Sequence, residues 1–311
     1  MSILKSSGKY EYLTDHDPKL LELALKLHRE RPDLQKAFPD VDSPGFLRWL
    51  NVDAYMAYDY VREFYPDIPP IEGMNVTSAG GVGGFLEGGF ESFHMIHSAA
   101  RRQGKALRSF DRVLDFGCGF GRTLRYWPAH ADHVELHGCD VNREGVEWCK
   151  GALDFAKFET TSPHPRLPYA DGMFDLIWAN SIFSHLEENN HKEWLEELAR
   201  ISRENALLIL TTHGPESLGM VLSDADRCAN VGLTPAQAQG AKLRLDKTGY
   251  AFCRQPGMTN PDLYGMTFIT PEYVKENWTR EFDVVEHEPL GLQGWQDFVV
   301  VKPRPMRLRR A

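Results

Sequence analysis

The sequence has no long apolar run, since none approaches the ~20 consecutive apolar residues of a membrane-spanning helix. Met1 to Tyr10 also lack the apolar segment of a secretory signal. Basic residues are few, with 35 Lys and Arg against 44 Asp and Glu. The formal net charge of −9 argues against a general nucleic-acid binder, which needs a basic face. We therefore expect a cytoplasmic protein with no membrane span and no nucleic-acid partner.

Cysteine is scarce as well. The five cysteines form no C-x-x-C pair and show no zinc-type spacing. An odd number of cysteines without a framework fits reduced thiols rather than disulfides. No group of metal ligands can be assembled from the sequence, so we expect no metal site.

Basic residues cluster only at the end of the chain, at Lys302, Arg304, Arg307, Arg309 and Arg310. Prolines are interleaved with them, which is typical of a solvated, frayed terminus. We interpret residues 304–311 as a basic tail, with a docking role as the alternative.

The first part of the chain, residues 1–105, is predicted to be a mainly helical extension. Apolar residues at helical spacing begin at Leu20. The segment from Pro66 to Gly89 contains three pairs of adjacent glycines and is predicted to be a mobile loop rather than a phosphate-binding loop. A helix is predicted from Glu91 to Gln103.

From Arg112 onward, short apolar runs alternate with amphipathic stretches, the pattern of a parallel α/β sheet. A helix is expected between the last two of the early strands, capped by Asn190. The candidate strands of this part are Val113–Phe116, Glu135–Cys139, Phe174–Ala179 and Ala206–Thr212.

Residues 215–267 interrupt the alternation and are too long for an ordinary connection. We predict an insertion with structure of its own, which covers the substrate as a lid. The last strands, Phe282–Glu286 and Asp297–Val301, are joined by a connection too short for a parallel crossover and must pair antiparallel. The core therefore comprises residues 106–214 and 268–303.

The pattern that most strongly indicates a ligand-binding function is a strand that runs into three alternating glycines. It lies in the segment Asp115-Phe116-Gly117-Cys118-Gly119-Phe120-Gly121. Glycine suits a tight backbone turn that a ligand approaches closely. The helix expected after this loop would offer free N–H groups to an anion. The alternative for Asp115 is a salt-bridged acid of the core.

A second acid, Asp140, ends the next strand. A carboxylate at this place can accept two hydrogen bonds from a ribose diol, whereas the alternative is a helix N-cap. The dinucleotide fingerprint G-x-G-x-x-G is not matched, because Arg122 holds the place of its third glycine. A nicotinamide or flavin enzyme is therefore a remote alternative.

These motifs resemble those of class I S-adenosylmethionine-dependent methyltransferases. Val113 to Gly121 resembles their first motif, and Asp140 matches their ribose-binding acid. The resemblance implies a Rossmann-like, doubly wound, seven-stranded and mostly parallel sheet with a C-terminal antiparallel hairpin. It implies S-adenosyl-L-methionine as cofactor, held by Asp115, Gly117, Cys118, Gly119, Gly121, Asp140, Val141 and Asn180.

Two histidines follow strands of the predicted sheet, His185 after Phe174–Ala179 and His213 after Ala206–Thr212. Each is a candidate general base for removing a proton from the methyl acceptor, and each could instead be a packed core residue. The resemblance favours O-methylation of a small molecule or glycan. Alternatives are a peptide or protein carboxylate or amine methyltransferase, and a non-catalytic cofactor-binding subunit.

Overall fold

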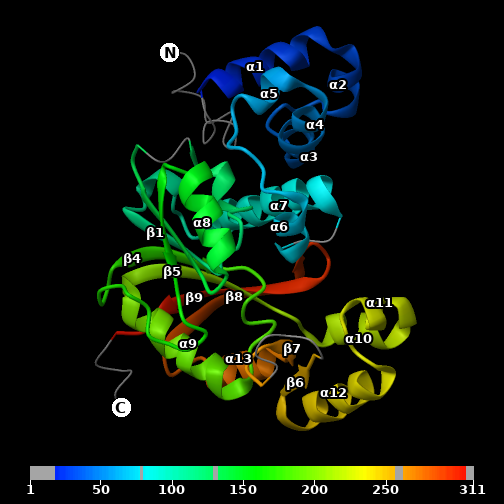
Figure 1. The fold of residues 1–311 in the computed structure, drawn as a ribbon, viewed down its shortest axis with the longest axis vertical. Helices are drawn as coiled ribbons and strands as arrows, with labels where there is room; N and C mark the ends of the chain where they lie inside the picture. Colours follow the sequence, from blue (N-terminus) through cyan, green and yellow to red (C-terminus); the bar gives the residue numbers. More distant parts are fainter. Residues whose placement is uncertain (1–17, 78–79, 129–131, 256–261, 306–311) are drawn as a thin grey trace. The chain divides into compact units, whose positions relative to one another are not determined.

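The computed structural model describes residues 18–77, 80–128, 132–255 and 262–305, and the chain forms two compact units (Figure 1). Unit 1 comprises Met1–Asp111, Cys118–Gly138 and Asn142–Glu159, and unit 2 comprises Arg112–Gly117, Cys139–Val141 and Thr160–Ala311. The chain passes from one unit to the other within the glycine loop and again around Asp140.

Unit 1 is mainly helical before Asp111. Its helices are α1 (Pro18–Glu30), α2 (Pro32–Ala37), α3 (Pro44–Arg48), the π-helical turn η3 (Trp49–Ala54), α4 (Tyr55–Ala57), α5 (Asp59–Arg62), α6 (Ile71–Thr77), α7 (Gly81–Arg102), the 3₁₀ turns η4 (Leu107–Ser109) and η5 (Leu124–Tyr126), and α8 (Arg143–Ala152). Strand β3 (Ala156–Thr160) and most of β2 (Glu135–Asp140) also belong to it.

Unit 2 contains the remaining strands and the insertion. Its elements are β1 (Arg112–Phe116), β4 (Phe174–Ala179), α9 (Glu188–Ile201), β5 (Ser202–Thr212), α10 (Pro215–Ser223), α11 (Ala225–Asn230), α12 (Pro235–Thr248), β6 (Tyr250–Arg254), β7 (Gly265–Ile269), α13 (Pro271–Asn277), β8 (Phe282–Leu292) and β9 (Gln296–Pro303).

Seven strands form one sheet in the order β3-β2-β1-β4-β5-β9-β8. β4 pairs in parallel with β1 on one side and with β5 on the other. In this register Val113 lies opposite Leu176, and Ile177 lies opposite Leu208. β9 runs antiparallel to both β5 and β8, which confirms the predicted terminal hairpin. The sheet is therefore mixed and mostly parallel in its first five strands, as the sequence predicts.

Apolar side chains on β1, β4 and β5 form the main core with one face of α9. Leu114, Ile177 and Leu208 are fully buried there, and Trp194 and Leu198 of α9 pack onto them. Val113, Leu176 and Ile209, which point to the opposite face, are fully buried as well. Burial of both faces explains the near-continuous apolar sequence of these strands.

The insertion has a separate core, as predicted. Helices α10, α11 and α12 pack beside the two-stranded antiparallel sheet of β6 and β7 (Figure 1). Leu218, Ala241 and Phe268 are fully buried in this second cluster. The capping box of Thr234 and Gln237 begins α12, and Gly249 with φ 73° ends it.

Two predictions for helices are wrong. The pairs Gly83-Gly84 and Gly88-Gly89 lie inside α7 and not in a loop. At Gly89 the missing side chain lets another backbone approach, since a Cβ there would meet the Arg122 carbonyl oxygen at 2.1 Å. The N-cap of α9 is Glu187, whose carboxylate accepts from the N–H groups of Asn189 and Asn190, while Asn190 lies within the helix.

The start of the predicted basic tail is part of the fold. Lys302 lies in β9 opposite Asp283, and Arg304 donates to the Thr279 carbonyl at 2.7 Å. Arg307, Arg309 and Arg310 lie outside the described residues.

Two alanine substitutions in α7 test the close approach at Gly89. Gly89→Ala should lower the free energy of unfolding by about 1–3 kcal/mol, since the new methyl group must displace the Arg122 backbone. Gly83→Ala is the matched control, because its Cβ meets nothing within 4 Å, and it should be neutral or stabilising by up to about 1 kcal/mol. Urea denaturation measures both, and equal effects would contradict the packing role of Gly89.

Candidate active site

The glycine loop after β1 has the backbone that the sequence predicts. Gly117, Gly119 and Gly121 all have positive φ, at 83°, 54° and 72°. A Cβ on Gly117 would lie 2.2 Å from the Ile182 side chain, so this glycine is required both by its φ and by packing.

No α-helix follows the glycine loop, which corrects the sequence-based expectation. Residues 121–128 form turns and the short 3₁₀ helix η5. Space at Gly121 is taken by Leu153, which a Cβ would meet at 2.4 Å. Any anion bound here would therefore depend on the loop's own backbone rather than on a helix dipole.

Asp140 ends β2 and does not cap the helix that follows. The N-cap of α8 is Asn142, whose side chain accepts from the Gly145 N–H at 3.2 Å. The capping alternative for Asp140 is therefore wrong. Its side chain is half-buried, and the next residue, Val141, is 55% exposed. A carboxylate followed by an exposed apolar side chain suits a ribose and the adjoining base.

The remaining residues predicted for the cofactor are placed by the strands. Asp115 is buried in β1, Cys118 is buried in the loop, and Asn180 is half-buried directly after β4. Asn205, before the buried part of β5, has φ 64°, a left-handed conformation that asparagine adopts more readily than most residues.

The loop after β4 is held at Ser181 by three different elements. Ser181 has φ 61°, and its N–H donates to Thr211 Oγ1 of β5 at 2.8 Å. The Gln296 amide of β9 donates to Ser181 Oγ, and the Tyr264 hydroxyl donates to the Ser181 carbonyl at 3.4 Å. From sequence, Tyr264 is one of four aromatic residues, with Tyr250, Phe252 and Phe268, that could line an apolar wall of the acceptor site or form the insertion's own core. Gln296 was not singled out for a site, because its position matters only once β9 is folded.

Strand β7 of the insertion runs beside this loop. Its Gly265 N–H donates to the His185 carbonyl at 2.7 Å, and its Thr267 N–H donates to the Ser184 carbonyl at 2.9 Å. Glu187 N–H donates back to the Leu263 carbonyl at 3.0 Å. The insertion and the loop therefore form one hydrogen-bonded structure.

His185 and His213 lie together, as their places after two parallel strands predict. Their ring centroids are 5.8 Å apart and nearly perpendicular. His185 stacks on Tyr264 at 4.9 Å, and its Nδ1 lies 2.6 Å from the Gly265 carbonyl oxygen. A carbonyl can only accept, so Nδ1 bears the proton and Nε2 keeps its lone pair in the neutral ring. Burial lowers the pKa of His185 from its ordinary value, so the ring is neutral at pH 7.

His213 is more deeply placed, with 1% of its surface exposed. Its Nδ1 lies 3.3 Å from the Thr267 carbonyl, and its ring lies 5.0 Å from that of Trp295. Burial, and secondarily the neighbouring His185, lowers the pKa of His213 to about 3. His213 is therefore neutral over the whole physiological range.

The aromatic residues of the insertion divide between cores and site. Phe268 belongs to the insertion's own core and Tyr250 to the main core, whereas Tyr264 lies against His185. Of the residues weighed for an apolar wall, Tyr264 is thus the one beside the histidines. Burial, and then the Asp140 carboxylate, raises the pKa of Tyr264, so its hydroxyl stays protonated.

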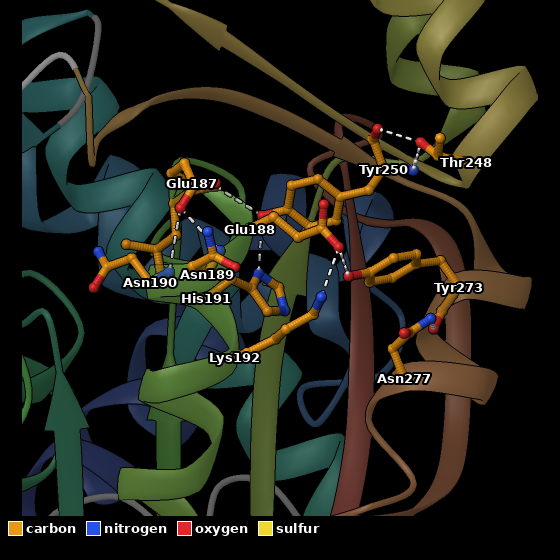
Figure 2. Close-up of polar contacts among 11 residues, drawn as sticks. Glu187, Glu188, Asn189, Asn190, His191, Lys192, Thr248, Tyr250, Tyr273 and Asn277 are labelled. Carbon is orange, nitrogen blue, oxygen red and sulfur yellow. Dashed lines mark hydrogen bonds and ion pairs between the residues drawn. The ribbon is translucent and has the colours of Figure 1, made fainter.

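A polar cluster, which is buried at Tyr250 and His191 and reaches the surface at Lys192, fastens the insertion to the start of α9 (Figure 2). The Tyr250 hydroxyl donates to the Leu186 carbonyl at 2.8 Å and lies 3.4 Å from His191 Nδ1. The Tyr273 hydroxyl donates to Glu188 Oε1 at 2.6 Å, and Lys192 donates to the same oxygen at 2.7 Å. Burial, and then Lys192, lowers the pKa of His191 to about 3.

Among the described residues, no group of three or more His, Cys, Asp or Glu side chains could hold a metal ion. Within the same part of the chain, no helix is both long and apolar enough to cross a membrane.

The sheet order and the glycine loop define a Rossmann-like α/β class, and comparison with known proteins makes the class more specific. Residues 114–210 match the family model described as a methyltransferase domain. The chain is 28% identical over 182 residues to 27-O-demethylrifamycin SV methyltransferase of Amycolatopsis mediterranei, covering 56% of this chain and 62% of that one. It is 27% identical over 163 residues to malonyl-[acyl-carrier protein] O-methyltransferase of Enterobacter lignolyticus, covering 49% and 58%.

Among solved structures, one similar chain is the 1,6-didemethyltoxoflavin-N1-methyltransferase of Burkholderia thailandensis. It shows 11% identity and a TM-score of 0.46, with 69% of this chain and 79% of that one covered. The chain spans less than two thirds of the length of the two curated relatives above. The segment from β1 to β5 is thus similar to methyltransferase domains, and the order of the strands is that of a Rossmann-like α/β fold.

The buried His191, which lies beside the Tyr250 hydroxyl, predicts that the free energy of unfolding depends on pH. His191 has a folded-state pKa of about 3 against ~6.5 in the unfolded chain, so only the unfolded state binds its proton between these values. Its contribution to stability is complete above pH 6.5 and is lost as pH falls toward 3, by at most about 1.4 kcal/mol per pH unit. His191→Phe should therefore lose less stability than wild type between pH 7 and 5.

Denaturant titrations at several pH values measure this effect. His164→Phe, at an exposed position, is the matched control and should follow wild type. A His191→Phe variant with the same pH slope as wild type would show that His191 is not buried in a neutral form.

Proposed function

We propose that the protein is an S-adenosylmethionine-dependent methyltransferase that O-methylates a small molecule or a glycan. The observation that supports this proposal most strongly is the methyltransferase-domain match over residues 114–210. That segment contains the whole sequence motif from Asp115 to Gly121, and Asp140 and Asn180 as well. The two curated relatives are named as enzymes that methylate small molecules or carrier-bound groups, which supports the acceptor class.

Residues of the motif would hold the cofactor. In this proposal Asp140 accepts hydrogen bonds from the ribose hydroxyls, and Val141 contacts the adenine. The loop residues Gly117, Cys118, Gly119 and Gly121, with Asp115 and Asn180, contact the methionine part. The half-buried Asp140, which caps no helix, and the exposed Val141 fit these roles.

The cofactor supplies a methyl group on a positively charged sulfur, and its transfer to oxygen leaves a neutral thioether. The protein must align the acceptor oxygen and remove its proton. We assign proton removal to His185, because its Nδ1–H is fixed on the Gly265 carbonyl and its Nε2 lone pair is left for an acceptor hydroxyl. Its half-buried position leaves the ring reachable by an acceptor.

His213 is the weaker candidate for the base. A pKa of about 3 makes its ring a poor proton acceptor, and its side chain is almost wholly enclosed. The lid proposed for residues 215–267 fits the bonding of β7 and Tyr264 to the loop that bears His185.

Cofactor identity is tested by calorimetry. S-adenosylhomocysteine should bind, and NAD and NADP should not. Asp140→Ala removes hydrogen bonds to a charged group, worth ~1.5–3 kcal/mol each, so the affinity for S-adenosylhomocysteine should fall roughly ten- to a hundredfold. Asp154→Ala, which removes an exposed acid, should bind as wild type does. Unchanged affinity in a folded Asp140→Ala protein would remove Asp140 from the site.

The base is tested by S-adenosylhomocysteine release with acceptors from a panel of methyl glycosides and phenols. His185→Ala should lower kcat by ~10²-fold with little change in cofactor affinity. His185→Asn keeps an N–H for the Gly265 carbonyl but has no basic nitrogen, and it should be equally impaired. Because burial depresses the pKa of His185, the acidic limb of the wild-type rate profile should lie below pH 6.5 and vanish in both variants.

Full activity in His185→Asn would show that the ring only positions the loop. His213→Ala, measured in parallel, should reduce kcat less than either His185 variant.

A further inference from the structure

Three polar groups meet where β5, β9 and the loop after β4 come together. His213 follows the last residue of β5, and Gln296 begins β9 one position beyond the Thr212–Asp297 pair, so the two lie opposite one another across the ladder. His185 lies against His213 and against Tyr264. We call His185, His213 and Gln296 the acceptor cluster.

Each member of the cluster presents an atom that can only accept a hydrogen bond. The Nδ1–H groups of both histidines face backbone carbonyls, those of Gly265 and Thr267, so each Nε2 keeps a lone pair. The Gln296 amide nitrogen donates to Ser181, which leaves its carbonyl oxygen Oε1 as the accepting group.

Two of these accepting atoms are buried without a partner among the described residues. They are His213 Nε2 and Gln296 Oε1, on side chains that are 1% and 7% exposed. A buried hydrogen-bond acceptor without a donor destabilises the folded state. Two such atoms in one cluster are therefore best explained by a ligand that donates hydrogen bonds to them.

The charges near the cluster argue against an anionic ligand. The lone pairs of two neutral histidines and an amide oxygen would repel a carboxylate. The cation that lies near is Arg227, which sits over the Trp295 ring at 5.3 Å from its centroid. The nearby Asp297 carboxylate is taken up by its own hairpin, since it binds His287 Nε2 at 3.1 Å and accepts from the Leu290 N–H at 3.0 Å.

Two aromatic rings flank the acceptor cluster, Tyr264 on His185 and Trp295 on His213. Aromatic faces beside hydrogen-bond acceptors suit a molecule with apolar C–H faces and several hydroxyl groups. We propose that the acceptor cluster is a hydroxyl-binding subsite, so that the methyl acceptor is a neutral polyol of the sugar class, with Gln296 as a substrate-binding residue. This inference rests on the proposed methyltransferase function and narrows its substrate class.

Neutral sugars can test the subsite without knowledge of the natural acceptor. The protein, labelled with ¹⁵N and saturated with S-adenosylhomocysteine, is titrated with the methyl pyranosides of glucose, mannose and galactose. The matched uronates and 2-amino sugars are titrated in parallel. We expect at least one neutral glycoside to shift the Gln296 side-chain amide and the His213 imidazole resonances, and to bind more tightly than its charged counterparts.

Gln296→Leu keeps roughly the volume of the side chain but removes both the accepting oxygen and the amide that donates to Ser181 Oγ, whereas Ser181→Ala removes only that internal hydrogen bond. The affinity for that glycoside should fall at least tenfold in Gln296→Leu and stay near the wild-type value in Ser181→Ala. Gln239→Leu, an exposed glutamine on α12, is the matched control and should leave it unchanged. Thermal unfolding of these variants confirms that they fold, and wild-type S-adenosylhomocysteine affinity in Gln296→Leu confirms that the cofactor site is intact.

The inference fails if no neutral glycoside shifts either group, if a uronate or amino sugar binds more tightly, or if folded Gln296→Leu binds as wild type does. Failure of S-adenosylhomocysteine to bind the wild-type protein would instead overturn the proposed function, and calorimetry before the titration separates the two results.

Discussion

His185 and Gly265 exchange two hydrogen bonds, and the geometry of the candidate site depends on this pair. The Gly265 N–H donates to the His185 carbonyl, and the His185 Nδ1–H donates to the Gly265 carbonyl. A side chain at position 265 is excluded, because a Cβ would meet the Cys253 carbonyl oxygen at 2.3 Å. The pair therefore fixes the imidazole tautomer, the path of β7 and the stacking of Tyr264 in a single arrangement. An insertion bonded in this way is part of the site and not an addition to it.

Much of the sheet was predictable from sequence, because its central strands are buried on a continuous apolar pattern. Ile177 and Leu208, which lie opposite one another, come from two such runs. The third strand of the seven expected was not located among the candidate strands, since Phe158 is the one buried residue of β3 and the others resemble a polar loop. The helix expected after the glycine loop is absent, because the apolar residues there pack as turns against the helices of unit 1.

In the candidate site, the residues whose positions could be predicted from sequence are those that directly follow parallel strands. His185 and His213 were predicted to share one edge of the sheet, and their rings are in contact. Tyr264 was one of four aromatic residues considered for an apolar wall, but its stacking on His185 depends on the bonding of β7 to the loop. Gln296 could not be predicted, because antiparallel pairing of β9 with β5 brings it in from a distant part of the chain. The signal that could have indicated Gln296 was its polar amide just before the apolar run from Phe298 to Val301.

The first 105 residues were predicted to be an extension, yet they supply the packing for the loop after β1. Phe120 of that loop is enclosed by Met74 and Phe85, and a Cβ on Gly73 would meet its ring at 2.6 Å. The Tyr126 hydroxyl donates to the Leu86 carbonyl at 2.9 Å, while Gly89 admits the Arg122 carbonyl.

Where an α-helix directly follows a strand, the loop between them is often fixed by the hydrogen bonds of that helix's first turn. Here the segment after Gly121 forms turns and the short 3₁₀ helix η5, with internal bonds such as that from the Arg125 N–H to the Gly121 carbonyl at 3.0 Å. Its conformation is stabilised in addition from outside. α6 and α7 provide that stabilisation by burying Phe120 and bonding Tyr126. The glycine-rich composition of α7, which resembles a loop in sequence, is thus the condition for a helix to lie close enough to hold the loop in place.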